Sequence, residues 1–446
     1  MKNVKINRRG FINGALKLTA GATVAYTASG VQMLNAAIPN DQGDYKALVC
    51  VFLYGGNDSH NMLVPMEGSV LADYQTVRGS LARQASAEME IFPEGQSFEG
   101  RLAFVDEMSA VKALFDRKKL AIQGNVGALI SPLPNGPKPK GLFAHNASQE
   151  NWMRGADLGQ KPTGWGGRLL DAYFGDAAEN TNFLRNISIG GSNSWQTGLN
   201  SRAYSVPTSG EIGKDYRYSR SWDNRRTHRQ ELIDNYHGSY QSDHILKSAF
   251  SRLYNNAVDN NAWLAEELSS VSIAHEFPDS SLGKQLGAVA KFIRLGKAQG
   301  LKRQVFFVGL GGFDTHNNQV NSHPGLLSHV SNAMASFYDF TENERIANEI
   351  TSFTMSDFGR SIRSNGNGTD HGWAGHQFIV GGAVEGGKIY GDLPYQNVNT
   401  SLRPTTSNEQ MFASLARWYG FNDDSVLNNL FPNLKHFSSN FIHYFA

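Results

Sequence analysis

Apolar runs of strand length alternate with helical patterns along most of the chain. Residues 47–53 (Ala-Leu-Val-Cys-Val-Phe-Leu) are continuously apolar, which is typical of a strand buried on both faces of a parallel sheet. Further strands are expected at 120–125, 303–310, 349–355 and 377–380, and helices at 108–119, 240–300, 326–337 and 407–418, the last capped by Thr406 or Ser407. This order of elements predicts an α/β fold with a doubly wound, mostly parallel sheet.

The N-terminus has the pattern of an export signal. Residues 8–12 (Arg-Arg-Gly-Phe-Ile) look like a twin-arginine motif, and small residues near Ala36 offer a cleavage point. The apolar stretch at 15–26 is too short to span a bilayer, so no stable transmembrane anchor is expected. We expect residues 1–36 to be a signal peptide that engages the twin-arginine translocase and leads to a periplasmic or otherwise exported protein. An ordinary basic N-terminus is the alternative.

Composition narrows the possible classes of protein. The 446 residues are 40% hydrophobic and 18% charged, which is enough apolar material for a large core and excludes wholesale disorder. The net charge of +1 gives no support for nucleic-acid binding. A single cysteine, Cys50, excludes intramolecular disulfides and cysteine-based metal clusters. We expect one domain over 45–446, with a largely helical insertion around 208–300.

Asp and His residues gather after the expected strands. They lie in 54–61 (Tyr-Gly-Gly-Asn-Asp-Ser-His-Asn), 311–317 (Gly-Gly-Phe-Asp-Thr-His-Asn), 355–360 (Met-Ser-Asp-Phe-Gly-Arg) and 368–376 (Gly-Thr-Asp-His-Gly-Trp-Ala-Gly-His). Ligands of open α/β sheets bind beyond the carboxyl ends of the strands, so these segments are expected to converge. Asp and His suit Zn²⁺, Mn²⁺ or Fe. Such a cluster would hold two divalent ions about 3.5–4 Å apart, with Zn or Mn preferred, and would lower the pKa of a bound water.

Each segment also has a purely structural interpretation. Asn57-Asp58 after two glycines is a common turn, and Asp357 could pair with Arg360 or cap a helix. The glycine-rich loop around Asp370 could simply be a surface loop. Arg360 is a candidate for binding an anionic substrate, with a surface ion pair as its alternative.

Six segments together resemble a known family. They are 52–58 (Phe-Leu-Tyr-Gly-Gly-Asn-Asp), 143–146 (Phe-Ala-His-Asn), 311–316 (Gly-Gly-Phe-Asp-Thr-His), 356–360 (Ser-Asp-Phe-Gly-Arg), 368–373 (Gly-Thr-Asp-His-Gly-Trp) and 386–391 (Gly-Gly-Lys-Ile-Tyr-Gly). On these motifs the chain is identified as a member of the DUF1501 family, which is grouped with the alkaline phosphatase-like superfamily of sulfatases and cofactor-independent phosphoglycerate mutases. The resemblance implies an α/β sandwich, with helices on both faces of a mostly parallel central sheet and a metal centre at the strand ends.

The resemblance also implies a set of metal ligands: Asp58, Asp314, His316, Asp357, Asp370, His371 and His376. Within this set, His371 and His376 are alternatives for the last histidine of the superfamily pattern. Asp357 and Asp370 are alternatives for its late carboxylate. The Asp-x-His spacing at 314–316 is shorter than the usual Asp-x-x-x-His of the superfamily.

The nucleophile is the point at which this sequence departs from the superfamily, whose enzymes attack with Ser, Thr or a modified Cys. Cys50 lies inside the first expected strand, and the position before His145, where relatives carry Ser, is Ala144. Ser148 and Ser59 are the possible substitutes. His145 is a candidate general acid/base or a ligand, and without a nucleophilic side chain a metal-bound hydroxide could attack.

These observations favour an exported, metal-dependent hydrolase of phosphate or sulfate esters that acts on a small anionic ester or a polymer. Its candidate catalytic residues are His145, Ser148 and Arg360. The alternative is a periplasmic binding or scaffold protein of the same fold that has lost catalysis. A redox enzyme is disfavoured because the sequence has no dinucleotide fingerprint and no cysteine cluster for copper or iron–sulfur centres.

Overall fold

The computed structural model of the protein describes residues 44–95, 101–156, 163–175, 183–209, 245–394 and 402–445. The expected signal peptide at 1–36 lies outside these residues, as does 210–244 of the expected insertion. No helix in the described ranges is both long enough and apolar enough to cross a membrane.

The expected α/β architecture is confirmed by a large sheet built around β1 (Lys46–Leu53). Nine strands of the described residues form this sheet, in the order β13-β5-β12-β9-β1-β8-β6-β7, with β14 pairing alongside β5. Their bounds are β13 (Lys388–Tyr390), β5 (Leu120–Gly127), β12 (Gly375–Gly381), β9 (Ile350–Ser356), β8 (Arg303–Leu310), β6 (Asn186–Ser188), β7 (Tyr204–Ser205) and β14 (Thr406–Ser407). Only the pairings of β12 are antiparallel, so the sheet is mostly parallel.

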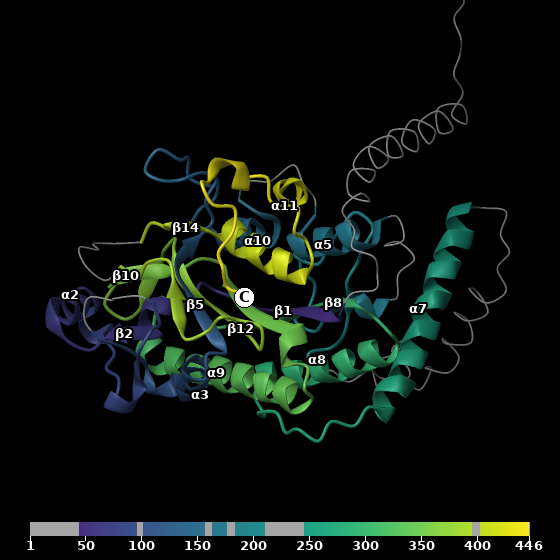
Figure 1. Cartoon of the computed structure of the whole chain (residues 1–446), viewed down its shortest axis with the longest axis horizontal. Helices are drawn as coiled ribbons and strands as arrows, with labels where there is room; N and C mark the ends of the chain where they lie inside the picture. The colour runs from purple at the N-terminus through teal and green to yellow at the C-terminus, as the bar shows by residue number, and fades with distance from the viewer. Residues whose placement is uncertain are drawn as a thin grey trace, which may run out of the picture.

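Both faces of the sheet are covered by helices, which explains why β1 is apolar at every position. The odd-numbered side chains of 47–53 pack into one hydrophobic core and the even-numbered ones into the other. Figure 1 shows the two helical layers with the sheet between them. The first is α3 (Ser109–Asp116), α8 (Ser281–Ala298) and α9 (Gln319–Asn343), and the second is α5 (Trp165–Phe174), α10 (Asn408–Tyr419) and α11 (Asp424–Leu430).

The helical region before β8 divides into two parts. α7 (Ile245–Ser270) stands at the side of the molecule in Figure 1, whereas α8 packs its apolar stripe into the core through Leu286, Val289 and Ile293. Helix α10, which α11 follows, begins after Ser407, one of the two caps expected from the sequence, and Ser407 forms a capping box with Gln410.

The smaller elements complete the fold. They are β2 (Leu63–Pro65), α2 (Gly68–Arg78), β3 (Glu90–Ile91), β4 (Leu102–Phe104), α4 (His145–Arg154), β10 (Arg360–Ser364) and β11 (Thr369–His371). Short 3-10 segments lie at Ser59–Asn61, Gly79–Leu81, Ala87–Met89, Asp106–Met108, Phe183–Arg185, Ala347–Glu349 and Leu434–His436. β2, β4 and β3 form a three-stranded antiparallel sheet, while β10 and β11 form an antiparallel ribbon.

Three parallel strands end at the same level and bring their loops together. Leu53 at the end of β1 pairs with Leu310 of β8 and with Ser356 of β9. The turn after β1 needs a glycine, because Gly55 has a φ of +114° and a Cβ there would lie 2.3 Å from the backbone nitrogen of Asp314. The loops after β1 and β8 therefore lie so close together that a side chain at position 55 would clash with the backbone of Asp314.

Candidate metal centre

A carboxylate at the end of β8 is surrounded by imidazoles. Oδ2 of Asp314 lies 3.4 Å from Nε2 of His145, the first residue of α4. Oδ1 of Asp314 lies 3.2 Å from Nε2 of His371, the last residue of β11. One ligand atom from each of these residues lies within 4.8 Å of the other two, a spacing that would allow them to share a metal ion.

His316 adds a third imidazole to this group. Its Nε2 lies 3.2 Å from Oδ1 of Asp314 and 2.9 Å from Nε2 of His371. We call His145, Asp314, His316 and His371 the outer cluster. All four side chains are partly exposed to solvent.

The tautomers of these histidines follow from their second hydrogen bonds. Nδ1 of His371 lies 2.6 Å from the carbonyl oxygen of Phe143, which only accepts, so this nitrogen carries the proton. Nδ1 of His316 lies 3.3 Å from Oδ1 of Asp370, and Nδ1 of His145 lies 2.7 Å from Oδ2 of Asp357. A ring that carries its proton on Nδ1 directs the lone pair of Nε2 toward the Asp314 carboxylate.

The outer cluster therefore brings three imidazole Nε2 atoms close to one carboxylate. Two Nε2 lone pairs facing each other at 2.9 Å, beside a carboxylate, repel unless a cation or an added proton lies between them. Burial lowers the pKa of His371, although the Phe143 carbonyl and the neighbouring Asp314 carboxylate oppose the effect, and this favours the neutral ring. Histidines that bind metals commonly donate the other ring N–H to a carboxylate or a carbonyl, which is the arrangement found here. These residues fit a divalent ion.

Asp357 supports the cluster from behind. It is buried, and its Oδ2 contacts His145 and accepts a hydrogen bond of 3.0 Å from Nε2 of Gln149. Its Oδ1 accepts a hydrogen bond of 3.1 Å from the backbone nitrogen of Gly55. Sequence reasoning placed Asp357 among the candidate ligands, and in the structure its carboxylate is bonded to Nδ1 of His145.

Arg360 orients Asp314 and is itself fully buried. Its guanidinium donates to Oδ1 of Asp314 at 2.8 Å, to the carbonyl oxygen of Gly55 at 3.2 Å and to both oxygens of Thr369. Burial acts to raise the pKa of Asp314, but the hydrogen bond and charge of Arg360, with help from the neighbouring histidines, outweigh it and lower that pKa. Because protein acceptors occupy the guanidinium, its geometry suits this orienting role and not the substrate-binding role expected from the sequence.

Asp58 lies in a second, deeper group. Its carboxylate forms a buried ion pair with Arg78 at the end of α2 and accepts a hydrogen bond from Gln319 of α9. His323 of α9 is buried nearby, with Nε2 3.0 Å from Oδ1 of Asn57. We call Asp58, Arg78, Gln319 and His323 the inner cluster. Burial acts to raise the pKa of Asp58, yet Arg78 and the nearby histidines lower it overall, so the carboxylate already has its counter-charge.

His376 is placed apart from the outer cluster. Its ring is buried edge-on against His60, with the centroids 5.1 Å apart, and its Nδ1 accepts a hydrogen bond from the backbone nitrogen of Asn125. Burial holds the pKa of His376 well below its usual value. Of the two histidines left open by the sequence, the structure therefore brings His371 to Asp314.

The remaining sequence candidates lie outside the outer cluster. Ser148 is buried within α4, and Ser59 is buried with its Oγ accepting from the backbone nitrogen of His376. Cys50 is buried inside β1, as expected. Asp370 receives hydrogen bonds from Asn365 and contacts only Nδ1 of His316, which makes it a supporting residue.

Sequence reasoning missed several contributors to these groups, among them Gln319 and His323 of α9. Gln149 stands four residues after His145 on α4, so helical spacing was an available signal. Arg78 lies in a helix with no motif of its own. The carbonyl of Phe143 is a backbone group, and no pattern of side chains reports where it points.

Three solved structures overlap loosely with this chain. The PsFucS1 sulfatase from Pseudoalteromonas sp. is 10% identical, with 89% of this chain and 71% of that chain covered and a TM-score of 0.35. Ps i-CgsB, in complex with k-i-k-neocarrahexaose, is 10% identical, with 86% and 75% covered and a TM-score of 0.37. The lipoteichoic acid synthase LtaP from Listeria monocytogenes is 9% identical, with 90% and 82% covered and a TM-score of 0.33. Overlaps of this size say nothing about reaction or substrate.

The two sequence comparisons gave different results. None of the curated proteins matches the chain significantly. The family model described as "Protein of unknown function (DUF1501)" matches residues 45–433, nearly the whole of the described fold. The chain therefore belongs to the DUF1501 family.

Proposed function

We propose that the protein is an exported, metal-dependent hydrolase of phosphate or sulfate esters. The observation that carries this proposal is the outer cluster, in which three imidazoles, each with Nδ1 already bonded, direct Nε2 at one ionised carboxylate. Such a set of bases is stabilised by a divalent cation, for which Zn or Mn are the candidates.

His145, Asp314 and His371 would hold the ion, and His316 lies beside Asp314 and His371. A divalent ion in this position would act as a Lewis acid on an ester oxygen and would lower the pKa of a bound water. The second ion implied by the family resemblance stays a prediction, because Asp58 is already paired with Arg78.

Residues around the cluster orient its ligands in a way that suits hydrolysis by water. Asp357 holds His145 in one tautomer, and Arg360 keeps Asp314 ionised and oriented. The two serines considered as nucleophiles, Ser59 and Ser148, are 1% and 3% exposed. Attack by a side-chain hydroxyl is therefore less well supported than attack by water.

The decisive experiment combines metal analysis with turnover. The protein is purified without chelators or affinity-tag metal, and its metal content is measured together with hydrolysis of p-nitrophenyl phosphate and p-nitrophenyl sulfate. We expect bound Zn or Mn, and turnover that is lost on chelation and restored by metal. Asp314→Asn should lose both, whereas the matched surface variant Asp116→Asn on α3 should keep both.

A folded, metal-loaded protein that turns over no phosphate or sulfate ester would contradict the hydrolase. That result would favour the alternative, a periplasmic binding or scaffold protein in which the cluster serves a structural or ligand-binding purpose.

Export and domain organisation belong to the same proposal. We propose that 1–36 is a twin-arginine signal peptide and that 45–446 is one domain with a helical insertion around 208–300. Replacing both Arg8 and Arg9 with Lys should retain the precursor in the cytoplasm, which cell fractionation would detect. Normal export of this double variant would remove the twin-arginine assignment.

A further inference from the structure

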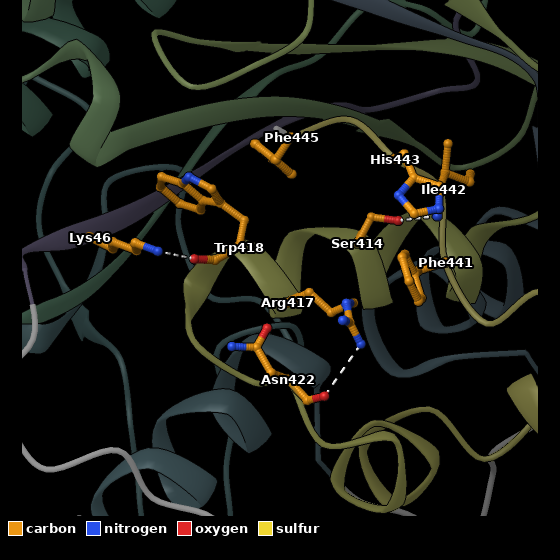
Figure 2. A pocket seen from close by; sticks show the side chains of 9 residues that line it. All are labelled: Lys46, Ser414, Arg417, Trp418, Asn422, Phe441, Ile442, His443 and Phe445. Atoms are coloured by element: carbon orange, nitrogen blue, oxygen red, sulfur yellow. Dashed lines mark hydrogen bonds between the residues drawn. The ribbon is translucent and has the colours of Figure 1, made fainter.

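A second site lies at the opposite end of the sheet. A pocket of about 360 Å³ opens beside Lys46, the first residue of β1, between α10 and the C-terminal segment 441–445 (Figure 2). The outer cluster lies beyond the other end of β1. Seven residue steps at roughly 3.3 Å each separate the two ends of this strand by about 23 Å, so the pocket is distinct from the candidate metal centre.

The pocket has a local excess of positive charge. Lys46 and Arg417 line it together with the imidazole of His443, and none of its lining residues, all within the described ranges, is acidic. The Lys46 amine donates only to a backbone oxygen, that of Trp418. Arg417 has a single carboxylate neighbour, Asp424 at 3.3 Å, which is not part of the lining. In a chain with 41 basic and 40 acidic residues, this is a marked local imbalance.

Flat aromatic surfaces stand beside these cations. The rings of Trp418 and Phe445 are stacked, with centroids 5.5 Å apart and planes inclined by 20°. The guanidinium of Arg417 lies 4.1 Å from the ring centroid of Phe441, and the Lys46 amine lies 5.3 Å from that of Trp418. Apolar faces and cationic donors therefore border the same hollow, as Figure 2 shows.

The pocket is held in shape by hydrogen bonds of its C-terminal wall. The backbone nitrogen of Ile442 donates to Oγ of Ser414 on α10 at 2.7 Å. The carbonyl of Tyr444 accepts from the backbone nitrogen of Glu385 at 2.7 Å, and Phe445 bridges to Val384. A wall tied at these points costs a ligand little ordering entropy.

We propose that this pocket binds a small organic anion that carries a flat ring, such as an aromatic carboxylate. The anionic group is recognised by Arg417 and Lys46, with the ring of His443 beside them, because charge-assisted hydrogen bonds are the strong ones and no described lining residue is acidic. The ring packs against the aromatic walls. The pocket volume is within the usual range for small-molecule sites. This site is independent of the proposed hydrolase.

The test uses three probes on the full chain: 2-naphthoate, the neutral 2-naphthol and the ring-free acetate. Isothermal titration calorimetry should show one 2-naphthoate per chain, with a Kd at least about tenfold below that of either other probe. Arg417→Gln and His443→Gln should each raise the Kd for 2-naphthoate by about tenfold or more, equivalent to about 1.4 kcal/mol.

Two controls decide whether the binding belongs to this pocket. Lys291→Gln on the exposed side of α8 removes one positive charge elsewhere and should leave the Kd unchanged. Asp314→Asn should also bind 2-naphthoate normally. Loss of binding in Asp314→Asn would assign the anion to the outer cluster and overturn the proposal, as would equal binding of all three probes. An unchanged Kd in folded Arg417→Gln and His443→Gln, checked by circular dichroism, would do the same.

Discussion

The outer and inner clusters each contain an aspartate and a histidine and lie at the same end of the sheet, yet the surroundings of their carboxylates differ. Asp314 is 45% exposed and faces the Nε2 atoms of three imidazoles. Asp58 is fully buried and faces the donors of Arg78 and Gln319. Asp58 has its counter-charge in Arg78, whereas Asp314, besides its bond to Arg360, faces imidazole nitrogens that a cation could bridge.

The two clusters are joined by a chain of hydrogen bonds. Oε1 of Gln319 accepts from the hydroxyls of Thr315 at 3.1 Å and Thr369 at 2.8 Å. The same Thr369 hydroxyl accepts from Nε of Arg360, whose Nη1 donates to Asp314. The inner cluster thus fixes Thr369 and Arg360, and through them the orientation of the exposed carboxylate.

The largest effect is expected from breaking the inner ion pair. Asp58→Ala leaves Arg78 buried without its counter-ion, which should reduce the free energy of unfolding by about 3–5 kcal/mol. Urea unfolding would measure the loss. Asp116→Ala, which breaks the exposed pair with Lys112 on α3, should change stability by less than about 1 kcal/mol. Similar losses in both variants would remove the distinction between the clusters.

Asp314→Asn tests the outer cluster with little damage to the fold, because the amide oxygen still accepts from Arg360. We expect metal affinity to fall by more than about 100-fold, beyond the effect typical of supporting residues. Competition with a chromophoric chelator would measure the affinity. If folded Asp314→Asn binds metal as tightly as the wild type, the outer cluster is not the metal centre.

Asp357→Asn should have a smaller effect on the same affinity, because Asp357 acts only through His145. A fall of about 10–100-fold is expected. Asp370→Asn is the matched control, since Asp370 is exposed and its Oδ1 lies 3.3 Å from Nδ1 of His316, and it should cost less than about tenfold. The reverse order of these two variants would show that His316, and not His145, is the ligand held most firmly.

The smallest effect is a pH dependence of stability from the buried histidines around Asp58. Burial lowers the pKa of His60 and that of His323 to about 4, although the charge of Asp58 partly opposes this. The unfolded chain therefore takes up protons first as the pH falls below about 6.5. Stability is present above that pH and is lost toward pH 4, by about 1 kcal/mol per imidazole between pH 6.5 and 5.5.

His323→Gln should reduce this pH dependence by about 1 kcal/mol over the same interval, because glutamine does not titrate there. Urea unfolding of the wild type and the variant at pH 6.5 and 5.5 would measure the difference. Equal slopes in the two proteins would show that His323 is protonated as easily in the folded state as in the unfolded chain.

Much of the fold could be predicted from the sequence alone. The continuous apolar run at 47–53 predicted a strand with helices on both sides, and the patterns after it located four more strands of the sheet. The candidate Asp and His residues were also expected where parallel strands end. Asp314 was among the predicted ligands. The strand and helix predictions succeed because periodicity and strand polarity are local properties of the chain, while the ligand role of Asp314 stays a prediction.

The partner of each polar side chain, in contrast, required the folded chain. Asp58 and Asp314 both follow a glycine-rich turn after a buried strand, and nothing in those motifs says that one meets Arg78 of α2 and the other meets His145 and His371. Those partners come from elements 20 to 170 residues away, brought in by packing against the sheet. A carboxylate becomes a counter-ion or a ligand according to what its oxygens face, and that is a property of the fold.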